Sequence, residues 1–165
     1  MQPARKPYSS EPSIAAFAGL ETGVLGGLVI LAWYALSSVA QGEAAWTVPA
    51  NLAALLYRWP SFEGRLTLAA ASGAAIEIVG AGASGILFGS IARGVRSHRR
   101  VLLLGVLFGL GWHYALQAIL ARHSTAADYL FSQRPVIAGH LLFGLWLGMF
   151  TRLFDRIRAG LPPSR

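Results

Sequence analysis

The stretch from Gly105 to Leu120, GVLFGLGWHYALQAIL, decides how the rest of the chain is interpreted. It is apolar enough to lie in a membrane, yet Gly105, Gly109, His113 and Gln117 recur at every fourth residue. Residues four apart share one face of an α-helix, so this face is small at one end and polar at the other. Small residues let membrane helices pack closely, and polar residues in hydrocarbon need partners. The stretch therefore predicts a membrane helix that packs against other helices through this face.

The composition fits an integral membrane protein of one domain. The chain has 165 residues, of which 55% are hydrophobic and 13% are charged. Its net charge of +7 does not indicate a nucleic-acid partner, because the basic residues lie at the ends of apolar runs, where membrane topology explains them. The absence of cysteine excludes disulfides, thiolate catalysis, iron–sulfur clusters and Cys-ligated zinc.

Four apolar runs are about as long as the ~20 residues that a spanning helix needs. A cleaved signal peptide is the alternative for the first run, but that run is far longer than the ~7–15 apolar residues of such a peptide. The prediction is an all-α integral membrane protein, a four-transmembrane-helix bundle. Its single membrane domain, 1–165, comprises a polar tail at 1–13, spans at about 14–39, 66–92, 101–121 and 135–150, and a basic amphipathic tail at 151–165.

The connectors between the spans carry aromatic residues that favour the membrane surface. Thr47 is expected to cap a short interfacial helix that has Pro49 in its first turn and continues through residues 51–58. The aromatic residues around this helix are Trp46, Tyr57, Trp59 and Phe62. Between the third and fourth spans, Ser124 is a second candidate cap, and an interfacial patch is expected at Tyr129, Leu130 and Phe131.

The positions of Lys and Arg predict the orientation. The two tails and the loop 93–100 together hold ten, and the two long connectors hold four. The positive-inside rule therefore places both termini in the cytoplasm, and we expect a bacterial cytoplasmic (inner) membrane. The basic residues expected to face lipid phosphates or other anions are Arg93, Arg96, Arg99, Arg100, Arg152, Arg156 and Arg158.

Two pairs of spans share short stretches of sequence. Gly-Val-Leu-x-Gly-Leu occurs at 23–28 and at 105–110, and residues 83–89 are similar to residues 138–144. These matches are consistent with a duplicated hairpin in parallel orientation. Chance similarity between spans rich in Gly, Ala, Leu and Phe is the alternative.

Four polar side chains, Glu77, His113, Gln117 and His140, are predicted to form one intramembrane cluster. Ionisable groups at this depth cost about 2.5–3.5 kcal/mol on insertion scales, so they normally face the bundle. Each lies on a row of small residues and in the outer half of its span or near its middle. Glu21 lies apart, toward the cytoplasmic side, where we expect it to reach the interface or a neighbouring hydroxyl.

Three functions remain open for this cluster. The first is a structural or accessory subunit of a larger membrane complex, in contact with lipids and with other subunits or a second copy. Its polar groups would then only bridge helices, with Glu77 either neutral or bonded to His113. The second is binding of a haem, a pigment or a quinone through His113 and His140. The third is a path for protons or small solutes along Glu77, His113 and His140.

Catalytic signatures are lacking in the sequence. It contains no nucleophile elbow, no H-E-x-x-H and no phosphate-binding loop. No catalytic residue and no metal site are therefore predicted, and enzymatic activity is not expected.

Overall fold

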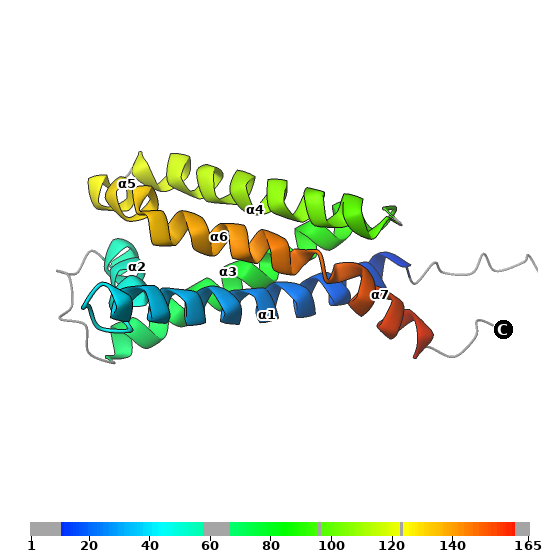
Figure 1. Ribbon diagram of the computed structural model, residues 1–165, viewed down its shortest axis with the longest axis horizontal. Coiled ribbons are helices and arrows are strands. Elements are labelled where there is room, and N and C mark those ends of the chain that lie inside the picture. Colours follow the sequence, from blue (N-terminus) through cyan, green and yellow to red (C-terminus); the bar gives the residue numbers. More distant parts are fainter. Residues whose placement is uncertain (1–10, 58–66, 96, 123, 161–165) are drawn as a thin grey trace, which may run out of the picture.

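The described part of the chain is built from seven helices. The computed structural model describes residues 11–57, 67–95, 97–122 and 124–160, and these contain no strand. The helices are α1 (Glu11–Ala40), α2 (Thr47–Tyr57), α3 (Leu68–Ala92), α4 (His98–Ala121), α5 (Thr125–Ser132), α6 (Arg134–Leu147) and α7 (Phe150–Ala159) (Figure 1).

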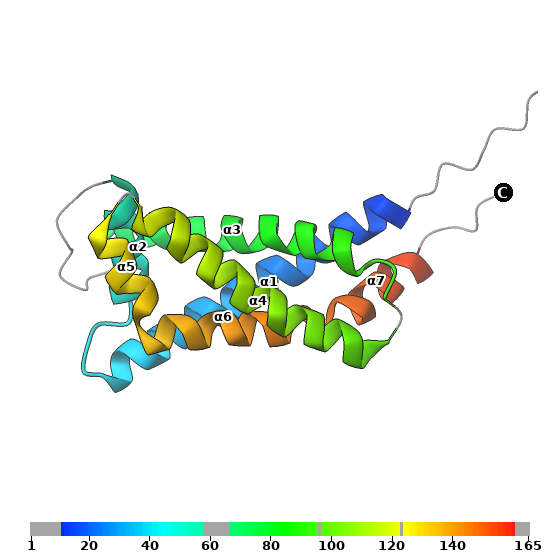
Figure 2. The same cartoon turned by 90° about the horizontal axis from the view of Figure 1, so that it is seen from above.

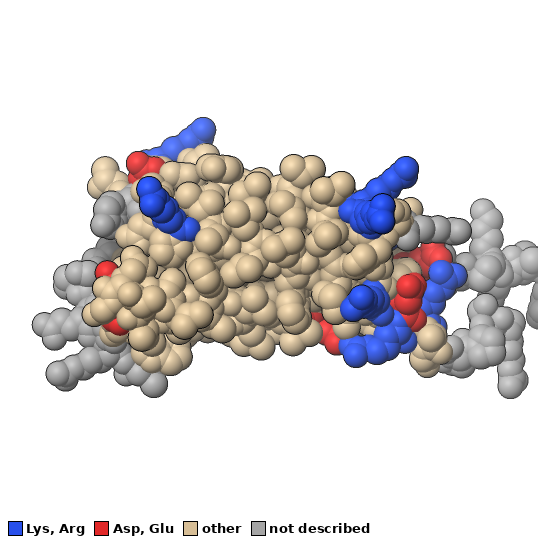
Figure 3. All heavy atoms as spheres, in the orientation of Figure 1, with Lys and Arg blue, Asp and Glu red and all other residues tan. Residues whose placement is uncertain are grey.

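Four helical segments are long and apolar enough to cross a membrane: α1, α3, α4 and the α6–α7 segment. The shortest of them, α4, has 24 residues and so a length of about 36 Å, against the ~30 Å of a bilayer core. On the face seen in Figure 3, Lys, Arg, Asp and Glu gather at the two ends and leave an uncharged band between them. The predicted all-α architecture with four spans is confirmed.

The remaining helices mark the two ends of the bundle. Helices α2 and α5 lie together at one end, and α7 lies with the start of α1 at the other (Figures 1 and 2). We call these the α2–α5 end and the α7 end.

The fourth span is interrupted near its α7 end. Helix α6 closes at Leu147, and the amides of Gly148 and Met149 bond to carbonyls three residues back, which tightens the last turn. Helix α7 then packs against α1 and buries Phe150 and Leu153. The sequence predicted a helix continuing into the tail, and the structure adds this break.

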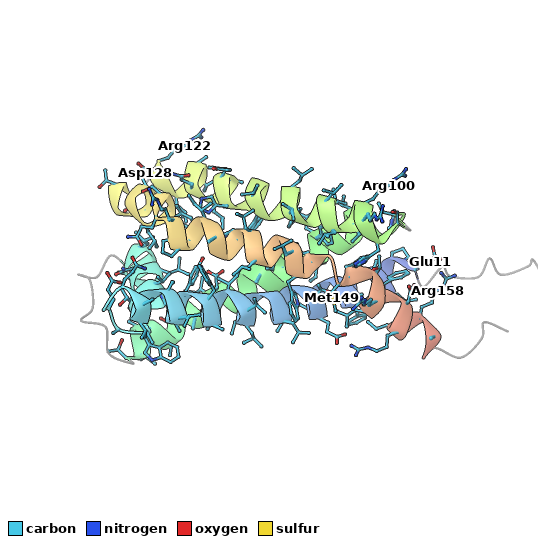
Figure 4. All side chains as sticks on the ribbon, viewed as in Figure 1. Glu11, Arg100, Arg122, Asp128, Met149 and Arg158 are labelled. Carbon is cyan, nitrogen blue, oxygen red and sulfur yellow. The ribbon has the colours of Figure 1, made fainter. Side chains whose placement is uncertain are left out.

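Two of the arginines predicted to face lipid phosphates or other anions pair with carboxylates of α1. Arg156 Nη2 lies 2.5 Å from Glu21 Oε1, and Arg158 Nη2 lies 3.6 Å from Glu11 Oε1 (Figure 4). Because all four side chains are substantially exposed, each pair stabilises the α1–α7 contact by only about 0.2–1 kcal/mol. Arg96 lies outside the described residues.

Glycines bring the helices together in two crossing pairs, α1 with α3 and α4 with α6. A Cβ on Gly23 would overlap the carbonyl oxygen of Ala81 and lie 2.9 Å from the Cα of Gly85. A Cβ on Gly109 would lie 2.5 Å from the His140 carbonyl oxygen and 2.9 Å from the Cα of Gly144. These backbones approach so closely that only glycine fits at either crossing.

The two crossings match each other, but in a register that differs from the sequence match by one helical turn. Gly23 corresponds in its contacts to Gly109, and Gly85 corresponds to Gly144. The sequence match paired Gly23 with Gly105 and Gly85 with His140, four residues earlier in both helices. The likeness stops at the connectors, because α2 packs mainly on α3 whereas α5 packs mainly on α4.

Both connector helices pack against the spans. In α2, Ala50 and Ala53 are fully buried, and the carbonyl of Pro49 lies so close to Gly73 of α3 that a Cβ there would collide with it. In α5, Leu130 and Phe131 are buried in the core and do not form a surface patch. Small residues on α2 and α3 allow this close packing.

The predicted caps are only partly correct. Thr47 is the first helical residue of α2 and does not precede it as an N-cap residue, and its hydroxyl donates to the Ala44 carbonyl at 2.8 Å. Ser124 stands at the N-cap position of α5, but its side chain makes no capping hydrogen bond. The side-chain cap that forms is at α3, where Thr67 Oγ1 accepts from the Ala70 amide at 3.2 Å. Trp59 and Phe62 of the predicted surface segment fall outside the described residues.

Candidate functional site

A cavity of about 240 Å³ lies toward the α2–α5 end of the bundle. Six helices, α1 to α6, supply its walls, and most of the lining side chains are aliphatic or aromatic. The aromatic lining residues are Tyr34, Trp112, Phe131 and Phe143. The lining residues with polar groups include Tyr34, Glu77, Ser84 and His140. An apolar pocket with a few convergent polar groups is the usual form of a small-ligand site.

The cavity exists because one helix interface of the bundle is incomplete. Helices α1 and α6 pack together, whereas α3 and α4 make few contacts. Ile76 and Gly80 of α3 and Trp112 and Leu116 of α4 line the cavity. A Cβ on Gly80 would meet no atom within 4 Å, so the wall is hollow at this point.

The opposite wall is held by aromatic rings seated on glycines. A Cβ on Gly139 of α6 would lie 2.7 Å from the Tyr34 ring, and a Cβ on Gly26 of α1 would lie 2.7 Å from the Phe143 ring. Each helix thus receives a ring of the other. The indole Nε1 of Trp33 also donates to the Pro135 carbonyl at 2.8 Å, which ties α1 to the start of α6. This wall is therefore closely packed, in contrast to the α3–α4 side.

His140 presents one ring nitrogen that is already engaged. Its Nδ1 lies 2.9 Å from the Val136 carbonyl oxygen, one turn earlier on α6. A carbonyl only accepts, so this contact assigns the proton of the neutral ring to Nδ1 and leaves Nε2 as an acceptor. His140 lines the cavity and therefore offers it a hydrogen-bond acceptor.

His113 lies behind His140, outside the cavity lining. It is 0% exposed, and its ring centre lies 4.8 Å from that of His140 at 64°, an edge-to-face contact. Neither ring nitrogen of His113 makes a hydrogen bond to any residue that the structure describes, although the backbone of Phe131 comes close. His113 is thus a packed side chain with unsatisfied polar atoms.

The expected contact between Glu77 and His113 is not formed. Within the described ranges the ion pairs are Glu21–Arg156 and Glu11–Arg158, so no histidine nitrogen lies within 4.0 Å of the Glu77 carboxylate. This contact does not form because the His113 face of α4 packs on α6, whereas Glu77 belongs to α3. Glu77 instead shares the cavity with Tyr34 and His140.

The remaining predicted polar residues lie elsewhere. Gln117 Nε2 donates to Asp128 Oδ1 at 3.0 Å and joins α4 to α5 at an exposed position. Glu21 reaches the α7 end, where it pairs with Arg156. The structure therefore brings Glu77 and His140 to one cavity, places His113 against its wall and leaves Gln117 outside.

Sequence reasoning missed Tyr34, Trp112 and Gly80 as cavity residues. Tyr34 continues the four-residue row of Gly26 and Ile30, which is the same kind of signal that singled out His113. Trp112 and Gly80 carry no such signal, because their position follows from a gap between two helices and not from their own spacing.

The geometry limits what the two histidines can hold. Rings 4.8 Å apart are in direct contact, so no macrocycle can lie between them. A cavity of 240 Å³ is also below the ~300–1,000 Å³ of sites for drug-sized ligands, and a porphyrin does not fit in it. No cluster of three or more His, Asp or Glu able to hold a metal ion occurs in the described part of the chain.

No family model, curated protein or solved structure matches the chain. Its function is therefore inferred from its own residues.

Proposed function

We propose that this is a small membrane protein that binds a lipophilic, ring-sized ligand in the cavity between α3 and α4. The observation that carries the proposal is that an aromatic-lined cavity lies between α3 and α4, two spans that make few contacts with each other. A molecule dissolved in the bilayer would pass between α3 and α4 without crossing a packed wall. Of the three functions considered from the sequence, this one is closest to binding of a small ring compound through the histidines. His140 would lie at the ligand, and His113 behind His140.

The size of the cavity supports a ring with short substituents. An apolar protein cavity of ~150 Å³ holds a benzene molecule. The 240 Å³ found here leaves room for a few further atoms beyond one six-membered ring. A longer tail on the ligand would extend between α3 and α4 into the bilayer.

Filling the cavity from Gly80 is expected to abolish binding. In Gly80→Leu the new side chain has open space to enter, so we expect the fold to be kept. The leucine side chain then occupies the part of the cavity that the ligand needs. The measurement is fluorine NMR of a fluorinated alkylbenzene added to the protein in nanodiscs, with empty nanodiscs as the reference for bilayer partitioning. We expect a bound resonance for the unmodified protein and a loss of at least about tenfold in affinity for Gly80→Leu.

Gly111→Leu is the matched control for that experiment. Gly111 is also a glycine within a span with nothing within 4 Å of an added Cβ, but it does not line the cavity. It should bind the probe like the unmodified protein. Equal binding by all three proteins, or no binding by the unmodified protein, would refute the proposal.

We further propose that the protein lies in a bacterial cytoplasmic membrane with both termini inside. The excess of Lys and Arg in the tails and the 93–100 loop supports this orientation. The chain has no cysteine, so single cysteines report topology directly. In intact cells a membrane-impermeant maleimide should label Glu43→Cys, at the α2–α5 end, and not Arg99→Cys, at the α7 end. The reverse pattern would overturn the orientation.

A structural or accessory role within a larger complex is the second candidate, with a different protein or a second copy as partner. It is favoured by the positions of His113, Gln117 and Glu21, which are engaged in packing or surface contacts and not in the cavity. Purification in mild detergent tests it: a partner retained in fixed stoichiometry supports this role, and a monomer that runs alone contradicts it.

A further inference from the structure

The cavity lining contains a carboxyl group without an ion-pair partner. Glu77 lines the cavity, and no Lys or Arg side chain does. The ion pairs of the described residues leave Glu77 without a cationic partner inside the protein. A carboxylate within a span is costly unless it takes up a proton, finds an opposite charge or reaches a wet surface. The missing charge is therefore one that a ligand can bring.

Of the other polar groups of the cavity, the Tyr34 hydroxyl can donate or accept, whereas His140 and Ser84 favour a ligand that donates hydrogen bonds. The Nδ1–H of His140 donates to the Val136 carbonyl, which leaves Nε2 as a hydrogen-bond acceptor. The Ser84 hydroxyl donates to the Ala81 carbonyl at 2.9 Å, so its proton is not offered to the cavity. A phosphate or carboxylate head group would meet Glu77 as a like charge. A ligand that only accepts, such as a quinone, would leave the acceptors of Glu77 and His140 unsatisfied.

The aromatic wall suits a positive charge. Tyr34, Trp112, Phe131 and Phe143 all line the cavity that contains Glu77. The faces of aromatic rings attract ammonium groups, most strongly where water is excluded. The same rings supply apolar contacts for the hydrocarbon part of a ligand.

We infer that the ligand is a lipophilic amine in its ammonium form, anchored by the Glu77 carboxylate inside the ring of aromatic side chains. This inference rests on the proposed function and names the chemical class of its ligand. The amine nitrogen donates to Glu77, its apolar substituents contact the aromatic wall, and any longer tail leaves between α3 and α4. No covalent step is involved.

The test compares two probes of the same shape that differ in charge. N,N-dimethylbenzylamine is a cation at neutral pH, and isobutylbenzene is its uncharged isostere with carbon in place of nitrogen. Binding of each to the full chain in nanodiscs is measured by equilibrium dialysis and corrected with empty nanodiscs. We expect the amine to bind more tightly than isobutylbenzene. Glu77→Gln should weaken the binding of the amine by at least about tenfold and change the binding of isobutylbenzene by less than about twofold.

Glu21→Gln is the control variant, since Glu21 is also a carboxyl on a spanning helix but pairs with Arg156 at the α7 end. It should leave the binding of both probes unchanged. Isobutylbenzene binding as tightly as the amine, or a Glu77→Gln variant that loses both probes equally, overturns the charge recognition and leaves the lipophile site standing. If neither probe binds the unmodified protein, the proposed function fails as well. Should Glu77→Gln not fold, the comparison of the two probes on the unmodified protein decides alone.

Discussion

Replacing Gly109 with valine is expected to separate α4 from α6. A Cβ at this position would lie 2.5 Å from the His140 carbonyl oxygen and 3.0 Å from the Gly144 amide nitrogen, so the colliding atoms are backbone atoms that no rotamer change can move away. Overpacking of side chains costs about 1–3 kcal/mol, and a collision with backbone belongs at the upper end of that range or beyond it. We expect a loss of about 3 kcal/mol in the free energy of unfolding, measured by titration of mixed micelles with dodecyl sulfate and followed by circular dichroism.

Gly111→Val is the matched control for this prediction. It makes the same change two residues along the same helix, where an added Cβ meets nothing within 4 Å. The β-branched side chain then alters only the helix propensity, which favours valine over glycine by a few tenths of a kcal/mol. If the two variants unfold at the same dodecyl sulfate concentration, the crossing of α4 and α6 does not depend on glycine and the packing described above is wrong.

This glycine row also shows what spacing can and cannot predict. The four-residue period of Gly105, Gly109 and His113 correctly identified the packed face of α4, because helix geometry fixes which residues share a face. It did not identify the partner. Rows of small residues occur on both α3 and α6, and either could accept the same face. The choice of α6 depends on how all the helices pack, which no single helix encodes.

The residues of the candidate site could also be predicted only in part from the sequence. Glu77 and His140 were predicted to share one location, and both line the cavity, because intramembrane polar groups face the protein interior. The direct bond between Glu77 and His113 does not form, because the His113 face of α4 packs on α6 and not on α3. The cavity itself could not be predicted, since it is the space left where α3 and α4 fail to meet.

The contact that joins α3 to α4 at the α7 end gives the second large expected effect. Phe88 of α3 is 0% exposed, and its ring centre lies 5.4 Å from that of Phe108 of α4 and 5.9 Å from that of Phe150 of α7, both in edge-to-face geometry. Three helices therefore meet on one side chain. Because α3 and α4 touch little, the Phe88–Phe108 contact is one of the few between them.

Phe88→Ala is expected to lower the free energy of unfolding by about 2–4 kcal/mol. In soluble proteins a buried Phe→Ala change costs about 3–5 kcal/mol. The value should be somewhat smaller here, because the side chain of the unfolded protein still lies in hydrocarbon and only packing is lost. Dodecyl sulfate titration measures it, with Phe17→Ala as the control: Phe17 is the same residue type on a spanning helix but is 65% exposed, and its truncation should cost under about 0.5 kcal/mol.

The same variant separates stability from ligand binding. Phe88 does not line the cavity, so the folded fraction of Phe88→Ala should bind the isobutylbenzene probe with an affinity within about twofold of the unmodified protein, as expected for a site it does not touch. Gly80→Leu should show the opposite combination, with stability kept and binding lost. If Phe88→Ala retained full stability, the α3–α4 contact would not rest on this ring. If it lost binding while remaining folded, the cavity would depend on the spacing of α3 and α4 along their whole length, and the α7 end would control access to it.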